Sequence, residues 1–208
     1  SSQKVNFFFV GFPKSGSTLF WNMLRKHPEI YSPPIKELNF FNFDHHQTMR
    51  RNLGKNYFKL IYSKKKYESL FEGFDCSLKG DFTPTYIYSQ KAPQMIYNYN
   101  QNAKIIISIR EPISFMRSTH FQNLYNLYED EEDFLTALSL EKERKKGSHI
   151  PKYCELPLIL YYSELVQYKK FISNFVNTFP LENIKIIIFD NICINKFQVY
   201  YELLSFLG

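Results

Sequence analysis

The chain alternates between two patterns of apolar and polar positions. Three short runs are almost uniformly apolar and rich in β-branched or aromatic residues, whereas the stretches between them carry apolar residues at helical spacing. Short, uniformly apolar runs are typical of strands that are buried on both faces of a parallel sheet. We therefore predict an α/β fold with a central, mainly parallel sheet flanked by helices. The predicted strands, all three expected to be central, are 5–10 (VNFFFV), 104–109 (KIIISI) and 184–189 (IKIIIF).

The longer periodic stretches predict the helices. The first should run from Ser17 to Lys26 and stop before His27-Pro28, because proline cannot continue a helix. We find neither an internal repeat nor a linker, and 208 residues with 44% hydrophobic content can bury one sizeable core, so we expect a single domain spanning 1–208. The further helices are expected at about 55–62, 90–99, 113–128, 131–145, 157–178 and 196–206.

Charge and cysteine content give partial information about the partner and the cellular compartment. The net charge of +6 favours an anionic partner, although ordinary solubilising charge explains it equally well. The three cysteines cannot all pair within the chain and have no metal-binding spacing, so a reducing compartment, and hence the cytoplasm, is the simpler expectation. No apolar run reaches the roughly 18 residues that cross a bilayer, so we expect no stable membrane insertion. The Golgi lumen is the alternative location if an N-terminal anchor was removed.

The segment from Gly11 to Thr18 joins the first predicted strand to the first helix. Its backbone N–H groups from Lys14 onward, with the Ser17 and Thr18 hydroxyls, would converge on an anion at the helix N-terminus. The nucleotide P-loop GxxxxGK[ST] requires a lysine directly after its second glycine, where this chain has Ser17. Lys14 lies earlier, so the magnesium-holding arrangement is not reproduced. An ordinary strand–turn–helix junction is the alternative to a phosphate site.

Two motifs together resemble one enzyme family. The run 12–18 (FPKSGST) resembles the 5'-phosphosulfate loop of the sulfotransferases, and 110–118 (REPISFMRS) resembles their 3'-phosphate motif. An arginine at the carboxyl end of a parallel strand points into the crevice where α/β folds bind ligands, and its fork suits a phosphate. The resemblance implies the sulfotransferase fold and a 3'-phosphoadenosine 5'-phosphosulfate (PAPS) donor, whose product is adenosine 3',5'-bisphosphate (PAP). The nucleotide-binding residues that it implies are Lys14, Ser15, Gly16, Ser17, Thr18, Arg110 and Ser118.

A third motif supplies a candidate base. The run 34–41 (PIKELNFF) resembles a segment of heparan sulfate-type and related bacterial sulfotransferases, in which a glutamate is the proposed general base. A carboxylate on a loop beside the donor can remove the acceptor proton as the oxygen attacks sulfur. We therefore assign Glu37 as the catalytic base and Lys14 as the cation that neutralises the departing oxygen. The alternative is that Glu37 merely pairs with Lys36 or another basic neighbour.

The acceptor is expected to be a carbohydrate or another hydroxyl-bearing molecule. The run 80–86 (GDFTPTY) resembles the family's Gly-Glu-Lys-Thr-Pro-x-Tyr loop, with Phe82 where carbohydrate sulfotransferases commonly have lysine. Phe82 would favour a less charged acceptor, unless Lys79 or Lys36 compensates. We place acceptor recognition in 43–66, with His45 and Arg50 as candidates, although a solvated basic surface is equally compatible with this pattern.

Several expectations concern what the chain lacks. We expect no metal site, because the only close histidine pair, His45-His46, is expected to be solvated on a loop. The acidic run 129–133 (EDEED) is expected to be a loop and helix N-terminus without function. The family's late Lys-Gly loop over the nucleotide is missing before Gly208, so either the natural chain continues or donor affinity is weak.

Two other classes of function remain open at this stage. A P-loop kinase would share the fold, but the lysine after the second glycine is missing. A non-catalytic module that binds an anionic polymer would explain the charge, but it would not require Lys14, Glu37, Arg110 and Ser118 together; we expect no nucleic-acid partner. The sequence leaves the acceptor, the sulfation position and the oligomeric state undetermined.

Overall fold

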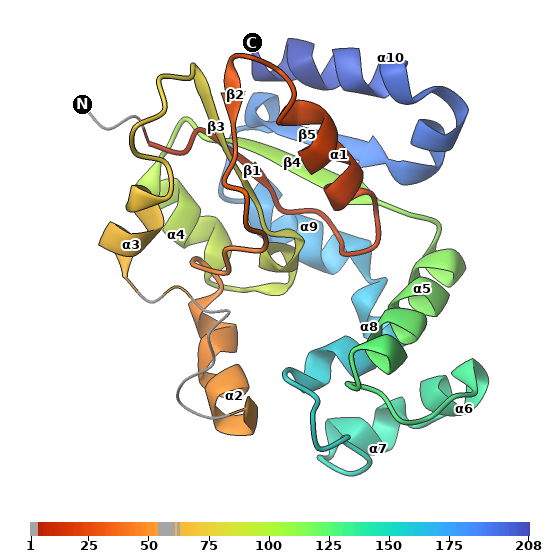
Figure 1. Cartoon of the computed structure of the whole chain (residues 1–208). Helices are drawn as coiled ribbons and strands as arrows, with labels where there is room; N and C mark the ends of the chain where they lie inside the picture. The colour runs from red at the N-terminus through yellow and green to blue at the C-terminus, as the bar shows by residue number, and fades with distance from the viewer. Residues whose placement is uncertain (1–3, 54–60, 62) are drawn as a thin grey trace.

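The protein is built around a five-stranded sheet in which every neighbouring pair of strands is parallel. A computed structural model describes residues 4–53, 61 and 63–208 (Figure 1). The strand order is β2-β3-β1-β4-β5, which confirms the predicted α/β class. The strands are β1 (Phe7–Phe9), β2 (Ile30–Tyr31), β3 (Leu78–Phe82), β4 (Lys104–Ile109) and β5 (Ile184–Ile188).

The sheet differs from the prediction at both ends. β5 was expected to be central, but it lies at the edge, where Ile186 and Ile188 are 45% and 47% exposed. β3, which pairs with β1, was missed because its sequence LKGDF places Lys79 and Asp81 at buried positions. Both polar groups are satisfied internally, Lys79 by donating to the Phe71 carbonyl oxygen at 2.9 Å and Asp81 by accepting from hydroxyl groups. The strand β3 was therefore not predicted, because two of its buried positions hold paired polar groups in place of apolar side chains.

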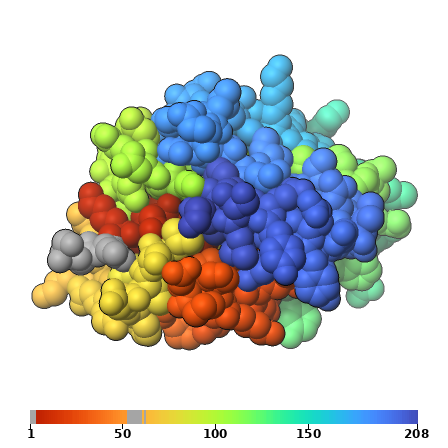
Figure 2. Space-filling view, turned by 90° about the horizontal axis from the view of Figure 1, so that it is seen from above, coloured from red at the N-terminus to blue at the C-terminus, as the bar shows by residue number. Residues whose placement is uncertain are grey.

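Two layers of helices cover the sheet. On one face, Phe7 and Phe9 pack with α1 (Ser17–Leu24) and α10 (Phe189–Leu207). On the other face, Phe8 packs among α3 (Lys64–Ser69), α4 (Ala92–Tyr99) and α9 (Tyr168–Val176). Successive residues of a strand point to opposite faces, so one run of phenylalanines serves both cores. Figure 2 shows the surface of α10, in dark blue, beside the orange-red surface of the segment around α1.

The predicted helices are mostly present but are shorter than expected. α5 (Pro112–Tyr125) matches the prediction for 113–128. The expected helix 131–145 is divided into α6 (Phe134–Ser139) and α7 (Glu141–Lys145). The expected helix 157–178 is divided into the 3₁₀ helix η2 (Pro157–Leu160), α8 (Tyr162–Leu165) and α9. Two further 3₁₀ helices, η1 (Pro84–Tyr88) and η3 (Leu181–Asn183), were not predicted.

The second quarter of the chain and the C-terminal end also differ from the prediction. α2 (Phe43–Leu53) forms where no helix was expected, whereas the predicted helix 55–62 lies outside the described residues except for Ile61, which is not helical. The predicted helix 196–206 is the second part of α10, which bends at Asn195. No helix in the described ranges is long and apolar enough to cross a membrane.

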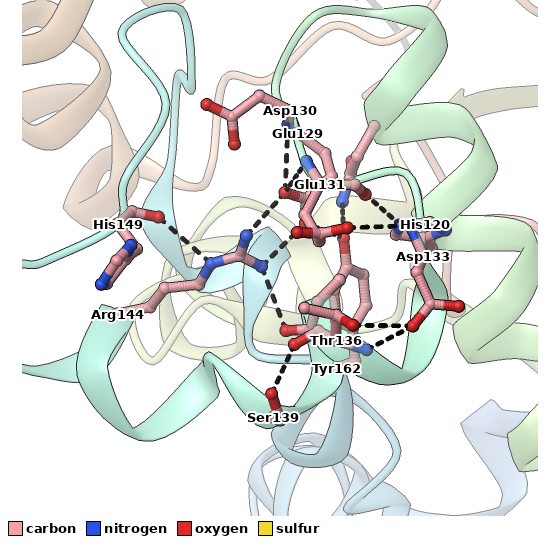
Figure 3. A network of polar contacts seen from close by, with 12 residues as sticks. His120, Glu129, Asp130, Glu131, Asp133, Thr136, Ser139, Arg144, His149 and Tyr162 are labelled. Carbon is pink, nitrogen blue, oxygen red and sulfur yellow. Dashed lines mark hydrogen bonds and ion pairs between the residues drawn. The ribbon is translucent and has the colours of Figure 1, made fainter.

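A buried ion pair lies below the sheet, in the region of α5 to α8 (Figure 3). The Arg144 guanidinium donates to both carboxylate oxygens of Glu129, at 2.6 and 2.7 Å, and the Tyr162 hydroxyl donates to the same carboxylate at 2.8 Å. Burial raises the pKa of Glu129, but the hydrogen bonds from Arg144, the Glu131 amide and Tyr162 outweigh it and hold that pKa below its usual value. The acidic run 129–133 is thus partly buried, and only its last residue, Asp133, serves as a helix cap as expected.

Candidate active site

The loop between β1 and α1 is shaped by two glycines. Gly11 passes so close to β4 that a Cβ atom there would lie 2.2 Å from the Ser108 backbone nitrogen. Gly16 caps α1 with a φ of 90°, a backbone conformation that other residues adopt only with strain. α1 therefore begins directly after this loop, and its first N–H groups have no acceptor within the helix. This geometry is suited to binding an anion.

Lys14 and Arg110 meet at this loop. The Lys14 ammonium donates to Gln122 Oε1 on α5 at 3.0 Å. Arg110, directly after β4, donates to the Lys14 carbonyl oxygen at 3.2 Å, and its guanidinium lies 5.2 Å from the centre of the Phe189 ring. Ser118 and Gln122 are four residues apart on α5 and line the same cleft, as their helical spacing requires.

Lys36 is a second lysine at the loop. Its ammonium donates to Ser17 Oγ at 2.9 Å and to Thr18 Oγ1 at 3.2 Å. Burial lowers the pKa of Lys36, and the nearby Lys14 lowers it further, whereas Glu37 opposes both effects. The sequence suggested Lys36 only as a partner of Glu37 or as a substitute for the lysine missing at position 82. Its contact with the α1 N-terminus depends on the fold and has no local sequence signal.

One cleft of about 1180 Å³ unites these groups. This volume exceeds the range of about 300–1,000 Å³ that is usual for a site with a single small ligand. Among the predicted site residues, those that line the cleft are Lys14, Gly16, Ser17, Thr18, Glu37, Arg110 and Ser118. Glu37 therefore shares a cavity with the cations Lys14, Lys36 and Arg110, as acid–base chemistry beside a bound anion requires.

Four other predicted site residues, Ser15, Phe82, Arg50 and His45, do not line the cleft. Ser15 is fully buried, and its amide donates to the Phe12 carbonyl oxygen at 3.3 Å. Phe82 is 2% exposed and packs against Phe7 and Phe9 in the core, so it is not an acceptor contact. Its side chain lies on the strand face opposite to Asp81, because neighbouring residues in a strand alternate. Arg50 is exposed on α2 outside the cleft, whereas its neighbour Met49 lines it.

The histidine pair is also not as expected. His45 and His46 lie on α2, not on a loop, and are 8% and 2% exposed, so the prediction that they are solvated is wrong. Burial lowers the pKa of both imidazoles. His46 Nε2 lies 2.5 Å from the Asn39 carbonyl oxygen, which ties α2 to the Glu37 loop. In the described part of the chain, no three His, Cys, Asp or Glu side chains are grouped to hold a metal ion.

One part of the cleft was not predicted. It is lined by polar residues that come from different segments, including Asn126 and Tyr128 after α5 and Glu155 before η2. The Tyr128 hydroxyl donates to Glu155 Oε2 at 2.7 Å. Such groups can orient a polar ligand through hydrogen bonds. Because no common spacing connects them along the chain, only the fold could reveal that they line one cavity.

Comparison with known proteins adds sequence relatives. A scan against models of known protein families gives no match. The chain is 28% identical to membrane-associated sulfotransferase kil1 of Dictyostelium discoideum over 110 residues, covering 52% of this chain and 21% of that protein. It is 24% identical to mouse heparan sulfate glucosamine 3-O-sulfotransferase 5 over 188 residues, covering 86% of this chain and 46% of that protein. The chain thus spans less than half the length of these curated relatives.

Solved structures agree with the sequence relatives. The fold matches a sulfotransferase from Alicyclobacillus acidocaldarius with a TM-score of 0.84 and 26% identity, covering 99% of this chain and 81% of that one. It also matches the sulfotransferase domain of the curacin biosynthetic pathway with a TM-score of 0.61 and 20% identity, covering 100% of this chain and 75% of that one, a likeness of fold alone. Sequence relatives and structural neighbours carry the same family name, and together they support assigning the chain to the sulfotransferase family.

Proposed function

We propose that the chain transfers a sulfuryl group from PAPS to a hydroxyl or amine acceptor, with a carbohydrate as the favoured acceptor. The observation that carries this proposal is that Glu37 lines the same cleft as Lys14, Lys36 and Arg110 and the N-terminus of α1. The family relationship supports the same reaction class. The heparan sulfate glucosamine named for one relative supports a carbohydrate acceptor.

The residues present suit a nucleotide that carries phosphate at both ends. The N-terminus of α1, with the Ser17 and Thr18 hydroxyls, offers neutral donors for the 5' group. Arg110 and Ser118 would hold the 3'-phosphate from the other side of the loop, where the guanidinium fork favours a dianion. Lys14 connects the proposed sites for the 5' group and the 3'-phosphate, since its side chain lies in the cleft and its carbonyl oxygen accepts a hydrogen bond from Arg110.

The donor supplies an activated sulfur–oxygen bond, and the chain's residues supply acid–base and electrostatic assistance. In the proposed in-line displacement, the acceptor oxygen forms a bond to sulfur as the bond from sulfur to the bridging phosphate oxygen breaks. Glu37 takes the acceptor's proton. Lys14, and Lys36 beside it, neutralise the charge that develops on the departing PAP. Preorganised charges of this kind need no covalent intermediate.

Calorimetry tests the donor assignment. We expect PAP to bind without magnesium, because lysine and arginine side chains rather than a metal ion neutralise its phosphates. Binding of ATP that requires magnesium, or binding of neither nucleotide, would contradict the proposal. An acceptor screen with labelled PAPS, comparing neutral and acidic glycans, phenols and amines, then tests the acceptor class; sulfation of phenols alone would exclude the carbohydrate.

Replacing Arg110 should remove recognition of the 3'-phosphate. A charge-assisted hydrogen bond contributes about 1.5–3 kcal/mol, so Arg110→Ala should weaken PAP binding by roughly 10- to 100-fold. AMP, which has only the 5'-phosphate, should bind both proteins with similar affinity. Arg110→Lys keeps the charge without the fork and should give an intermediate loss for PAP. Equal weakening of PAP and AMP would instead assign Arg110 to the shape of the loop, through its bond to the Lys14 carbonyl oxygen.

A further inference from the structure

The carboxylate of Asp81 is buried in β3 beneath the loop that carries Glu37. It accepts three hydroxyl donors: Thr83 Oγ1 at 2.6 Å, Tyr67 OH at 2.9 Å and Tyr86 OH at 3.0 Å. The ion pairs of the described residues include none to Asp81, and burial raises its pKa to about 6, although the three hydroxyls lower it. At pH 8 it is therefore ionised and can only accept hydrogen bonds.

Two of the three hydroxyls hold the Glu37 loop. Thr83 Oγ1 accepts from the Leu38 amide at 3.0 Å and from the Asn39 amide at 3.4 Å. Tyr86 OH accepts from the Phe40 amide at 2.9 Å. Among the described hydrogen bonds, the Tyr67 hydroxyl accepts none from the backbone amides of residues 38 to 40.

The direction of these bonds follows from the charge on Asp81. A hydroxyl has one proton, and because the carboxylate has none, Thr83 and Tyr86 must each use that proton toward Asp81. The lone pairs of these two hydroxyl oxygens are then available to accept hydrogen bonds from the backbone amides of residues 38 to 40. An amide side chain in place of Asp81 would present a donor to one of these hydroxyls and disturb this arrangement. Buried networks of this kind depend on every member being satisfied.

We propose that Asp81 is a positioning residue, which orients the Thr83 and Tyr86 hydroxyls so that they hold the segment directly after Glu37. The segment Asp81-Phe82-Thr83-Pro84-Thr85-Tyr86 thereby acts as a support for the base. The acidic position of this motif has a role beneath the site, whereas Phe82 packs on the other face. The catalytic consequence rests on the proposed sulfuryl transfer, but the structural consequence does not.

Hydrogen–deuterium exchange at pH 8 tests the structural consequence without any ligand. Tyr86→Phe and Tyr67→Phe form a matched pair, since both tyrosines are fully buried and both donate to Asp81 Oδ2. Tyr86→Phe and Asp81→Asn should raise the exchange rates of the amides of residues 38 to 40 by roughly tenfold or more, because local opening sets these rates. Tyr67→Phe should leave them within about twofold of wild type. Amides of β4 serve as the internal reference for global stability.

A second pair tests the threonine. Thr83→Val keeps the shape and removes the hydroxyl, so the Leu38 amide should lose its protection, whereas Thr83→Ser should retain it. If Asp81→Asn fails to fold, these pairs still decide the question. Equal exchange in Tyr86→Phe and Tyr67→Phe, or unchanged exchange in Thr83→Val, would overturn the proposal.

Turnover tests the catalytic consequence. Donor hydrolysis, followed as release of labelled sulfate from PAPS with water as the acceptor, should lose kcat in Tyr86→Phe by roughly tenfold or more with little change in KM, because misplacement of a catalytic group has effects of this order. Tyr67→Phe should retain wild-type kcat within about twofold. A loss confined to KM would overturn the positioning role. A wild-type protein that cleaves no PAPS but shows the expected exchange pattern would contradict the proposed function alone.

Discussion

Glu37→Gln is expected to reduce sulfuryl transfer by about 10²- to 10⁴-fold, the range that general-base catalysis contributes. The amide keeps the size of the side chain but cannot accept the acceptor's proton. Because the phosphates of PAP are proposed to be held by Lys14, Arg110 and the α1 N-terminus rather than by the Glu37 carboxylate, PAP affinity should remain within a few-fold of wild type. Steady-state turnover with labelled PAPS and calorimetry with PAP measure the two quantities.

A matched control separates the loss of the catalytic base from the loss of one negative charge. Glu68→Gln makes the same substitution on α3, outside the cleft lining, where Glu68 forms a surface ion pair with Lys64 at 3.7 Å. Its turnover should equal that of the wild type. A fully active Glu37→Gln protein would remove Glu37 from the role of base, and a parallel loss of PAP binding would indicate that Glu37 shapes the donor site instead.

Arg144→Ala is expected to destabilise the fold by about 3–5 kcal/mol, because it leaves the Glu129 carboxylate buried without its cation. The side chains of both residues are 0% exposed. For a domain of this size the loss corresponds to a decrease in melting temperature of roughly 6–20 °C. Thermal unfolding followed by circular dichroism measures it.

The neighbouring ion pair provides the comparison. Lys145 lies on the same helix and pairs with Glu141 at 2.7 Å, but its side chain is 42% exposed, so Lys145→Ala should cost at most about 1 kcal/mol. The folded protein holds the pKa of Glu129 below its value in the unfolded chain. The Glu129–Arg144 pair therefore stabilises the wild-type fold fully at pH values above the unfolded pKa, and this stabilisation is lost as the pH falls through the lowered, folded-state pKa. The two variants should therefore differ strongly at pH 7 and converge in acid. Equal melting temperatures for both at pH 7 would contradict the assigned role of the buried pair.

The sequence revealed those parts of the fold that depend on apolar burial. β1 and β4 were predicted because strands covered on both faces are apolar throughout. β3 was missed because Lys79 and Asp81 interrupt that pattern, and β5 was misplaced because the sequence does not show that its outer edge has no neighbouring strand. Apolar runs indicate strands, but they do not report strand order, and in β5 only Ile187 is buried.

The candidate site follows the same division. The sequence could predict Lys14, Arg110 and Ser118 as site residues, because each lies a fixed number of residues from a strand end or a helix start. Such a spacing along the chain also sets where the residue lies in the folded protein. Phe82 was wrongly placed among the acceptor contacts, because a motif gives the order of residues but not the face of the strand on which each lies. The contact of Lys36 with Ser17 joins residues 19 apart in the chain, and no local pattern reports it.

The sequence by itself thus determined the class of fold, and it indicated a candidate anion-binding loop before α1 and a candidate base at Glu37, since these depend on patterns within a few residues. Only the tertiary structure decided which polar groups meet. The support of the Glu37 loop connects the Leu38 amide to Thr83, 45 residues along the chain, and the buried pair connects Glu129 to Arg144 across 15 residues. Such partners are brought together by parallel strands and packed helices, and hydrogen bonds require a geometry that residue spacing alone cannot specify.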